Sequence, residues 1–261
     1  MKIPFNKYHG TGNDFILIDN RNHILDTDNQ PLIARMCHRH FGIGADGLIL
    51  LENSDSYDFK MHYFNADGRE GSMCGNGGRC VVSFAKKLGL IDTVARFEAI
   101  DGIHTASIEN DLVALQMSDV SHIEKHKNYV FLDTGSPHHV QLTEGIDVFP
   151  VFEKGREVRH AAPYYDTGTN VNFVEQIAPN TFKVRTYERG VEDETLSCGT
   201  GVTAVAIAMY ETGKTNKNRI QLQCLGGTLE VAFKKLKNNY QQIYLKGPAQ
   251  FVFEGIYITN R

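Results

Sequence analysis

Two cysteines of this 261-residue chain stand directly before glycine at predicted helix starts: Cys74 in SMCGNGGRC and Cys198 in SCGTGVTA. Glycines at such a position let backbone N–H groups approach a ligand closely, and the unsatisfied donors of a helix N-terminus favour an anion there. The same positive end lowers the pKa of a cysteine toward neutrality, which makes a thiolate available as a base. Each motif therefore predicts a carboxylate-binding helix end with an activated thiol.

Proton transfer at one carbon is the chemistry that a pair of such sites would perform. If two helix ends face each other, their sulfurs flank one carbon from opposite sides, and one thiolate removes the α-proton while the opposite thiol returns a proton. The carbanion also requires preorganised donors in a dry cleft. A single Cys-Gly at a helix start is more often a buried small residue beside a turn. The hypothesis therefore depends on the pair.

The surroundings of the two cysteines form an internal repeat. Apolar helices are predicted over residues 74–89 and 198–213, each ending at a glycine suited to the C′ position. Two alternating strands follow each helix, turning at Gly102 and at Gly226. Upstream, both copies read as strand, Thr-Gly turn, strand, and their spacing to the cysteine differs by one residue, which we place in the VEDE loop after Arg189. A repeat of this length predicts two similar domains.

The repeat and the nearly all-apolar helices predict an α+β fold. It consists of two pseudo-symmetric domains, each a curved, mostly antiparallel sheet around a buried central helix. The first half spans residues 1–117 and is completed by the C-terminal strand 249–261, and the second half spans residues 118–248. The cleft between the halves is then the default ligand site.

Composition narrows the class of partner. The net charge of −4 provides no basic footprint for nucleic acid, and no segment reads as a signal peptide or a membrane span. Five scattered cysteines without a Cys-x-x-Cys pair argue against a disulfide framework and against zinc. We expect a cytoplasmic protein that binds a small molecule, with no nucleic acid or membrane partner and no metal. Cys37, Cys80 and Cys224 are interpreted as core residues.

Three other signals are weaker. Residues 42–47, GIGADG, match the glycine pattern of a dinucleotide site, but they follow a helix-like segment and precede a strand, which is the reverse of the required order. The pairs His38/His40 and His138/His139 lack a third ligand at metal-site spacing. A pyridoxal phosphate site needs a Schiff-base lysine and a phosphate cup in a larger fold. None of the three predicts a cofactor.

Glu188 and Arg189 stand side by side at the end of the predicted strand TFKVRTY. Arg189 suits bidentate binding of a carboxylate, and Glu188 suits an ammonium group. Such a pair is ordinarily a solvated strand end. Its partner in the repeat is Asn65, which itself precedes Cys74, and this favours a functional interpretation.

Four segments resemble the motifs of the diaminopimelate epimerase family: HGTGNDF at 9–15, FNADGREGSMCGNGGRC at 64–80, GTNVNF at 168–173 and YERGVEDETLSCGTG at 187–201. The resemblance runs through essentially the whole chain. It implies a cofactor-independent enzyme that interconverts LL- and meso-diaminopimelate for lysine and peptidoglycan synthesis. It also implies that Cys74 takes the proton from the LL isomer and that Cys198 is the proton donor.

The resemblance further implies a set of substrate-binding residues. The backbone at four of them would hold the reacting α-carboxylate, and the others would grip mainly the non-reacting end. The full set is Asn13, Asn65, Gly75, Asn76, Asn170, Glu188, Arg189, Gly199 and Thr200. The chain departs from the family pattern at Ser136, where asparagine usually precedes Pro-His, so its contact with the substrate is in doubt. Ser136 and His138 are further candidates.

Two alternatives stay open. A proline or hydroxyproline racemase uses a related two-cysteine fold, although a substrate with one amino-acid end would leave Glu188 and Arg189 nothing to bind. In a non-catalytic binding module, the helix ends would capture an anion and the cysteines would be inert. Whether the chain forms a homodimer is also open.

Overall fold

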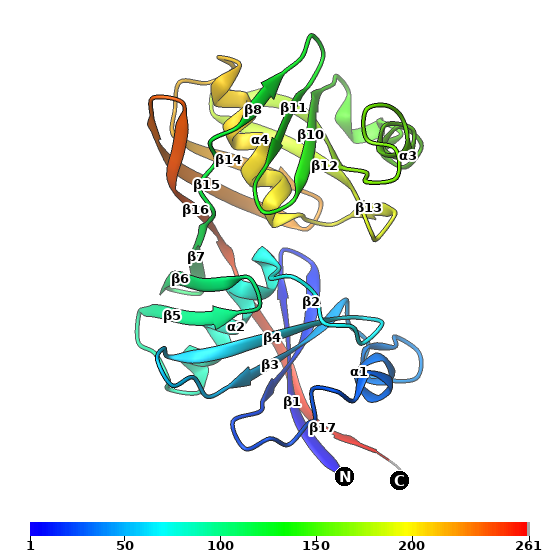
Figure 1. The fold of residues 1–261 in the computed structure, drawn as a ribbon, viewed down its shortest axis with the longest axis vertical. Helices are drawn as coiled ribbons and strands as arrows, with labels where there is room; N and C mark the ends of the chain where they lie inside the picture. Colours follow the sequence, from blue (N-terminus) through cyan, green and yellow to red (C-terminus); the bar gives the residue numbers. More distant parts are fainter. Residues whose placement is uncertain (260–261) are drawn as a thin grey trace. The chain divides into compact units, whose positions relative to one another are not determined.

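The chain divides into two compact units in the computed structural model, which describes residues 1–259 (Figure 1). Unit 1 contains residues 1–115 and the segment from Pro248 onward, and unit 2 contains residues 116–247. The halves predicted from the sequence, 1–117 with 249–261 and 118–248, have boundaries one or two residues away from these. Asn260 and Arg261, the last residues of the predicted strand 249–261, lie outside the described residues.

The sheet of unit 1 has the strand order β17–β1–β2–β3–β4–β5–β6–β7. Neighbouring strands are antiparallel except for the parallel pairs β2–β3 and β4–β5. The strands are β1 (Lys2–Gly10), β2 (Asn13–Asp19), β3 (Gly47–Glu52), β4 (Phe59–Asn65), β5 (Val94–Ala99), β6 (Gly102–Glu109), β7 (Leu112–Met117) and β17 (Gln250–Ile258). The last two residues of β7 belong to unit 2.

Two helices cover the two faces of β2 and β3. On one face, Ile16 and Leu48 pack with Ile33 of α1 (Gln30–Cys37) in one hydrophobic cluster. On the other face, Ile49 lies against α2 (Gly75–Lys87), where a Cβ added at Gly77 would be 3.1 Å from its Cδ1. Because side chains alternate along a strand and both faces are covered, these strands read as continuous apolar runs, FILI and LILL.

Unit 2 repeats this topology with the strand order β8–β9–β10–β11–β12–β14–β15–β16. Its parallel pairs, β10–β11 and β12–β14, correspond to β2–β3 and β4–β5. The short β13 pairs with the end of β12. The strands are β8 (Ile123–Lys125), β9 (Val130–Asp133), β10 (Pro137–Leu142), β11 (Asn170–Ala178), β12 (Thr181–Glu188), β13 (Asp193–Thr195), β14 (Arg219–Cys224), β15 (Gly227–Leu236) and β16 (Asn239–Pro248).

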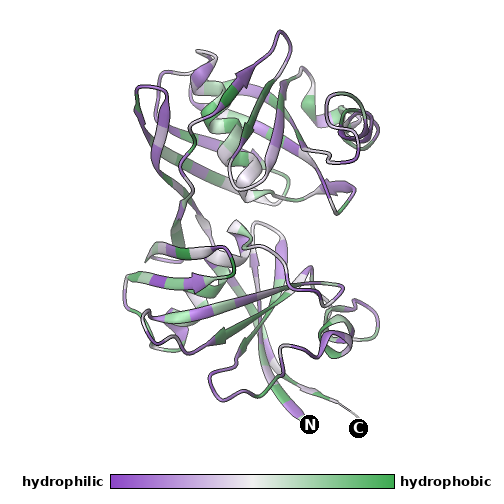
Figure 2. Cartoon of the chain, in the orientation of Figure 1, coloured by the Kyte–Doolittle hydropathy of each residue, from purple (hydrophilic) through white to green (hydrophobic). Residues whose placement is uncertain are grey.

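The helices of unit 2 also follow the repeat. After the short 3-10 helix η1 (Ile146–Val148), α3 (Val151–His160) comes between β10 and β11, where unit 1 has α1. The central α4 (Gly199–Glu211) is buried from Gly199 through Met209 except at Thr200, and Figure 2 shows its mostly apolar surface. Its buried Thr203 hydroxyl donates to the Gly199 carbonyl at 2.9 Å, so no polar group is left unsatisfied there. The predicted α+β fold with a buried central helix in each half is confirmed.

Most of the predicted register is correct. Both central helices are followed by a glycine in the left-handed region, Gly89 (φ 72°) and Gly213 (φ 70°). The extra residue in the second copy is in the loop after Arg189, because Tyr187 pairs with Glu194 whereas Phe64 pairs with Glu70.

Gly226 lies in the predicted turn between β14 and β15, but the residue equivalent to Gly102 in the repeat is Gly227, one position later. β15 begins at Gly227, whose φ of 139° corresponds to the 127° of Gly102. A second inserted residue therefore lies between α4 and β14.

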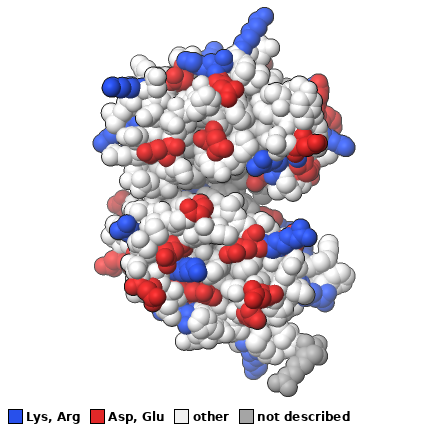
Figure 3. Space-filling model, viewed as in Figure 1, with Lys and Arg blue, Asp and Glu red and all other residues white. Residues whose placement is uncertain are grey.

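The described surface has no dominant charge. Figure 3 shows basic and acidic side chains interspersed on the face that it displays. No helix among residues 1–259 is both long and apolar enough to cross a membrane.

Candidate active site

The first candidate cysteine lies at the N-terminus of α2. Cys74 is the N-cap residue (φ −98°, ψ 128°), and Gly75 and Asn76 begin the helix. The Cys74 Sγ is 3.6 Å from the Asn13 Oδ1, which also accepts a hydrogen bond from the Asn76 Nδ2 at 3.1 Å. Asn13 comes from the start of β2, directly after the Thr11-Gly12 turn. Three predicted site residues therefore meet at one helix end.

A buried guanidinium lies beneath this helix end. Arg79 is fully buried and donates to the Asn76 Oδ1 at 3.0 Å, to the Gly75 carbonyl at 3.2 Å and to the Thr11 hydroxyl at 3.2 Å. Its positive charge adds to the helix dipole and favours an anion at the helix N-terminus. Arg79 was missed in the sequence, where the only signal is a cation inside an otherwise apolar helix.

Asn65 ends β4 and is exposed. Its backbone closes the following turn, donating to the Arg69 carbonyl and accepting from the Gly68 N–H, both at 2.9 Å. Among the described residues no hydrogen bond joins its side chain to Asn13 or Asn76. The structure therefore does not bring Asn65 into the cluster around Cys74.

The second candidate cysteine lies at the N-terminus of α4, where Cys198 is the N-cap residue. The Thr200 Oγ1 is 3.5 Å from the Cys198 Sγ and 2.9 Å from the Nε2 of His138. The Ser136 Oγ lies 3.2 Å from the same Thr200 oxygen and 3.1 Å from the His138 Nε2. Ser136 therefore lies among the residues around Cys198, and its contact with the substrate stays a prediction.

The proton positions at His138 follow from its partners. His138 is fully buried, and this burial, followed by the positive charge of Arg189, lowers its pKa to about 3, so the imidazole is neutral. The Asn172 Nδ2 donates to both the His139 carbonyl and the His138 Nδ1, each at 3.1 Å. The remaining His138 proton is therefore on Nε2 and is donated toward Thr200.

Thr200 can therefore act as a hydrogen-bond donor to sulfur. Its oxygen can accept from the His138 Nε2–H and from the Ser136 hydroxyl, which uses both lone pairs. The hydroxyl proton is then directed at the Cys198 Sγ. A hydrogen bond of this polarity stabilises a thiolate. Asn172, two residues after Asn170 and so on the same face of β11, was not identified from the sequence, although this spacing could have indicated it.

Asn170 extends the cluster to the other predicted binding residues. Its Nδ2 donates to the Ser136 Oγ at 3.3 Å and the Pro137 carbonyl at 3.0 Å, while its Oδ1 accepts from the Arg189 backbone N–H at 2.9 Å. The exposed Arg189 side chain donates to the Thr167 carbonyl at 3.0 Å. Glu188 accepts from the Thr195 hydroxyl at 3.0 Å. The predicted residues of unit 2 therefore gather around one end of its sheet.

The remaining cysteines differ in burial. Burial raises the pKa of Cys37 and of Cys80 to about 12, which makes both thiols unreactive core groups. Cys224 is only half-buried, because it ends β14 at the turn into β15. The prediction that Cys224 is a core residue was therefore wrong. Within residues 1–259 no group of three or more His, Cys, Asp or Glu side chains could hold a metal ion.

Two units of matching strand order, each with a buried central helix that a cysteine precedes at the N-cap, define a pseudo-symmetric α+β fold. Among solved structures, a PhzF-family protein of Bacillus anthracis covers 99% of this chain and 100% of its own with a TM-score of 0.79 at 15% identity. A hydroxyproline epimerase of Agrobacterium vitis, bound to trans-4-hydroxy-L-proline, covers 98% and 92% with a TM-score of 0.70 at 14% identity. These likenesses concern the fold alone.

Sequence similarity identifies the family. The profile described as diaminopimelate epimerase matches residues 5–123 and 130–252. The diaminopimelate epimerase of Flavobacterium psychrophilum is 58% identical over 249 residues, covering 95% of this chain and 97% of its own. That of Chlorobaculum tepidum is 44% identical over 255 residues, covering 94% and 98%. The chain belongs to the diaminopimelate epimerase family and is an isomerase.

Proposed function

We propose that the chain epimerises LL-2,6-diaminopimelate to the meso isomer without a cofactor, with Cys74 and Cys198 as the two acid/base groups. One observation carries this proposal: a cysteine caps the buried central helix in each of two units with the same strand order, in a chain of the diaminopimelate epimerase family. Inversion at a carbon needs one proton-transfer group for each face, and the repeat supplies two of the same chemistry.

The two cysteine sulfurs carry out both proton transfers of this reaction. In the LL-to-meso direction, the Cys74 thiolate takes the α-proton and becomes a thiol, while the bond's electron pair moves into the α-carboxylate. The Cys198 thiol then gives its proton to the opposite face and becomes a thiolate. Before the next LL molecule reacts, a proton leaves Cys74 and another returns to Cys198. The reverse reaction swaps the two roles.

The two helix ends supply the charge stabilisation. Backbone N–H groups at Gly75 and Asn76, and at Gly199 and Thr200, would hold the reacting carboxylate as negative charge builds on it. Excluding water from this carboxylate would strengthen these interactions.

The far end of the substrate sets the choice of substrate. We assign it to Asn13, Asn65, Asn170, Glu188 and Arg189, with Arg189 binding the carboxylate and Glu188 the ammonium group. Because a substrate without this second amino-acid end would leave these polar groups without substrate partners, it is rejected.

The test is incubation with LL-diaminopimelate in deuterium oxide under reducing conditions, following both stereochemistry and α-deuteration. We expect deuterium at the α-carbon and formation of the meso isomer by the wild type. Cys74→Ala and Cys198→Ala should each abolish epimerisation, whereas Cys224→Ala, which removes the half-buried thiol at the end of β14, should retain it. Near-wild-type epimerisation by both alanine variants at the helix ends would overturn the two-thiol mechanism.

A second substrate separates the alternatives. Trans-4-hydroxy-L-proline, which is bound in the related fold from Agrobacterium vitis, has one amino-acid end. We expect no exchange with it, because Glu188 and Arg189 would lack partners. Exchange with this compound but not with diaminopimelate would assign an imino-acid racemase. Binding of diaminopimelate without exchange would assign a non-catalytic binding module.

The cellular setting follows from the proposed substrate. Lysine and peptidoglycan precursors are the products that the family's activity serves, and the sparse, odd number of cysteines suits the reducing cytoplasm.

A homodimer is proposed at the outer edge of β17. Among residues 1–259, the partner of this edge strand is β1, and the strand exposes Val252, Phe253 and Ile256, each by 46–59%. Exposed apolar edge strands favour pairing with another chain. Sedimentation should show a dimer that Ile256→Lys dissociates, whereas Val148→Lys, at an exposed position in unit 2, leaves it intact.

A further inference from the structure

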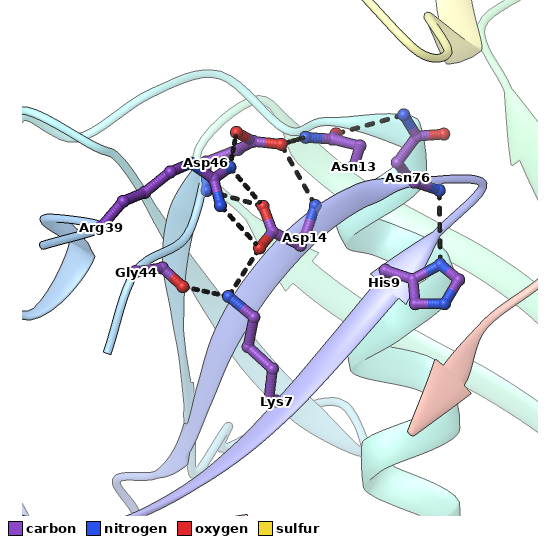
Figure 4. A network of polar contacts seen from close by, with 9 residues as sticks. Lys7, His9, Asn13, Asp14, Arg39, Gly44, Asp46 and Asn76 are labelled. Atoms are coloured by element: carbon purple, nitrogen blue, oxygen red, sulfur yellow. Dashed lines mark hydrogen bonds and ion pairs between the residues drawn. The ribbon is translucent and has the colours of Figure 1, made fainter. Parts of the chain in front are cut away.

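The glycine-rich segment 42–47, which matched no cofactor site, has a different use in the structure. Its Asp46 lies beside the start of β2, where its carboxylate accepts from the Asn13 Nδ2 at 2.8 Å, from the Asp14 backbone N–H at 3.2 Å and from Arg39 at 2.6 Å (Figure 4). The Asp46 backbone N–H donates in return to the Asp14 carbonyl at 3.0 Å. The segment thus braces the residue that faces Cys74.

This contact decides which way the Asn13 amide points. A carboxylate can only accept, so the Asn13 NH₂ group must face Asp46, and the amide oxygen must face the opposite way. The neighbouring amide, that of Asn76, is oriented by a positive charge. The guanidinium of Arg79 can only donate, so the Asn76 oxygen faces Arg79 and its NH₂ group faces the Asn13 oxygen. Two amides are therefore aligned between a carboxylate and a guanidinium.

The two aligned amides place a hydrogen-bond acceptor, the Asn13 oxygen, beside the Cys74 sulfur. The Asn13 oxygen lies 3.6 Å from the Cys74 Sγ, and an oxygen with lone pairs favours the S–H form of a neighbouring cysteine over the anion. We infer that Asp46 is a positioning residue, which locks the Asn13 amide with its oxygen toward Cys74 so that the free enzyme holds Cys74 as the thiol. This rests on the proposed role of Cys74 in proton transfer. The free enzyme is then set for the meso isomer, and turnover of the LL isomer first requires loss of that proton.

A network of charged side chains holds the segment 42–47 in place. The ammonium of Lys7, which is buried, lies 2.7 Å from the Asp14 carboxylate and also donates to the Gly44 carbonyl. Arg39 bridges Asp14 and Asp46, at 2.9 Å and 2.6 Å. Figure 4 shows Arg39 and Lys7 reaching Asp14 from two sides. Two cations and two carboxylates thereby fix the loop to β2.

The charge of Asp46 could also affect the protonation of Cys74 directly, and this effect must be distinguished from the orientation of the Asn13 amide. Removing the negative charge of Asp46 would by itself favour a nearby thiolate, whatever the orientation of the amide. The charged and titratable groups on the elements around this corner are Arg79 of α2, Asp46 and Arg39 of the loop before β3, Asp14 of β2, and Lys7 and His9 of β1. A double-mutant cycle distinguishes the charge effect from the orientation effect, because Asp46 can orient an amide only when Asn13 is present.

The experiment measures alkylation of Cys74 by iodoacetamide against pH, read by mass spectrometry of the Cys74 peptide without substrate. Four chains are compared: wild type, Asn13→Ala, Asp46→Ala and the double variant. Asn13→Ala should lower the midpoint by removing the acceptor, and Asp46→Ala should lower it by about half a pH unit or more by releasing the amide. In the Asn13→Ala background, Asp46→Ala should cause no further shift.

The outcomes are distinct. An unmoved midpoint in Asp46→Ala overturns the inference, and so does an equal shift in both backgrounds, which would show direct charge repulsion. Asp19→Ala removes a carboxylate paired with Arg21 at the other end of β2 and should leave the midpoint unchanged. If Asp46→Ala does not fold, as judged by circular dichroism, Asp46→Asn should give a smaller shift in the same direction. Because no substrate is present, failure of the epimerase proposal would leave this readout intact.

Discussion

Replacing Thr200 with valine tests the support of Cys198 most directly. Valine has nearly the shape of threonine but lacks the hydroxyl that lies 3.5 Å from the Cys198 Sγ and 2.9 Å from the His138 Nε2. A hydrogen bond to a charged group contributes about 1.5–3 kcal/mol. At about 1.4 kcal/mol for each factor of ten, its loss corresponds to a roughly 10- to 100-fold lower kcat/KM.

The Thr200→Val substitution should lower kcat/KM for both isomers and should raise the alkylation midpoint of Cys198 alone. The equilibrium between the isomers does not depend on the enzyme, so kcat/KM should fall by the same factor with the LL and with the meso isomer. The alkylation midpoint of Cys198 should rise, because its thiolate loses a donor, whereas that of Cys74 should not move. Thr200→Ser keeps the hydroxyl and should stay near wild type. A valine variant with wild-type turnover and an unchanged Cys198 midpoint would refute the role given to this hydroxyl.

Further predictions follow from the contacts in the surroundings of Cys74 and Cys198. Burial raises the pKa of Asp14, but bonds from Arg39 and Lys7 lower it by more, to about 2, so its stabilisation is full above about pH 4 and is lost as the pH falls toward 2. Asp14→Asn should therefore lower the free energy of unfolding at pH 7 by about 2 kcal/mol and flatten its pH dependence below pH 4 in urea titrations. Gly201→Ala would place a Cβ 2.5 Å from the Asn172 Oδ1, and calorimetry should show a loss of about 1–3 kcal/mol. Glu192→Gln weakens the ion pair with Arg159 that holds the loop after Arg189, so KM for diaminopimelate should rise with little change in kcat.

Features set by local sequence could be predicted. The apolar VTAVAIAM segment is a buried helix, and Gly89 and Gly213 end the two central helices, because each depends on residues within a few positions. The repeat also located the extra residue after Arg189. By contrast, Gly226 and Gly227 are adjacent and equivalent in sequence, and only strand pairing decides which one takes the positive φ.

Features set by distant partners could not be predicted. Asp46 acts on Asn13 across 33 positions, and the loop's glycine pattern suggested only a cofactor site, which its place before a strand excluded. Arg79 contradicts the usual preference of arginine for the surface, and its burial depends on a network of carbonyl, hydroxyl and amide oxygens contributed by separate segments. Such residues are visible only once the strands have been placed.

The pairing of β1 with β17 bears on how the chain is made. These strands lie near the two ends of the described chain and pair from Lys2 opposite Ile258 to His9 opposite Gln250, with a bulge between Lys7 and Tyr8. The sheet of unit 1 cannot close until β17 has been synthesised, although β1 is made well before it. Residues 116–247 are continuous and can form unit 2 earlier. Unit 1 is therefore completed after unit 2, and the edge of β1 that β17 covers stays unpaired until β17 has been made.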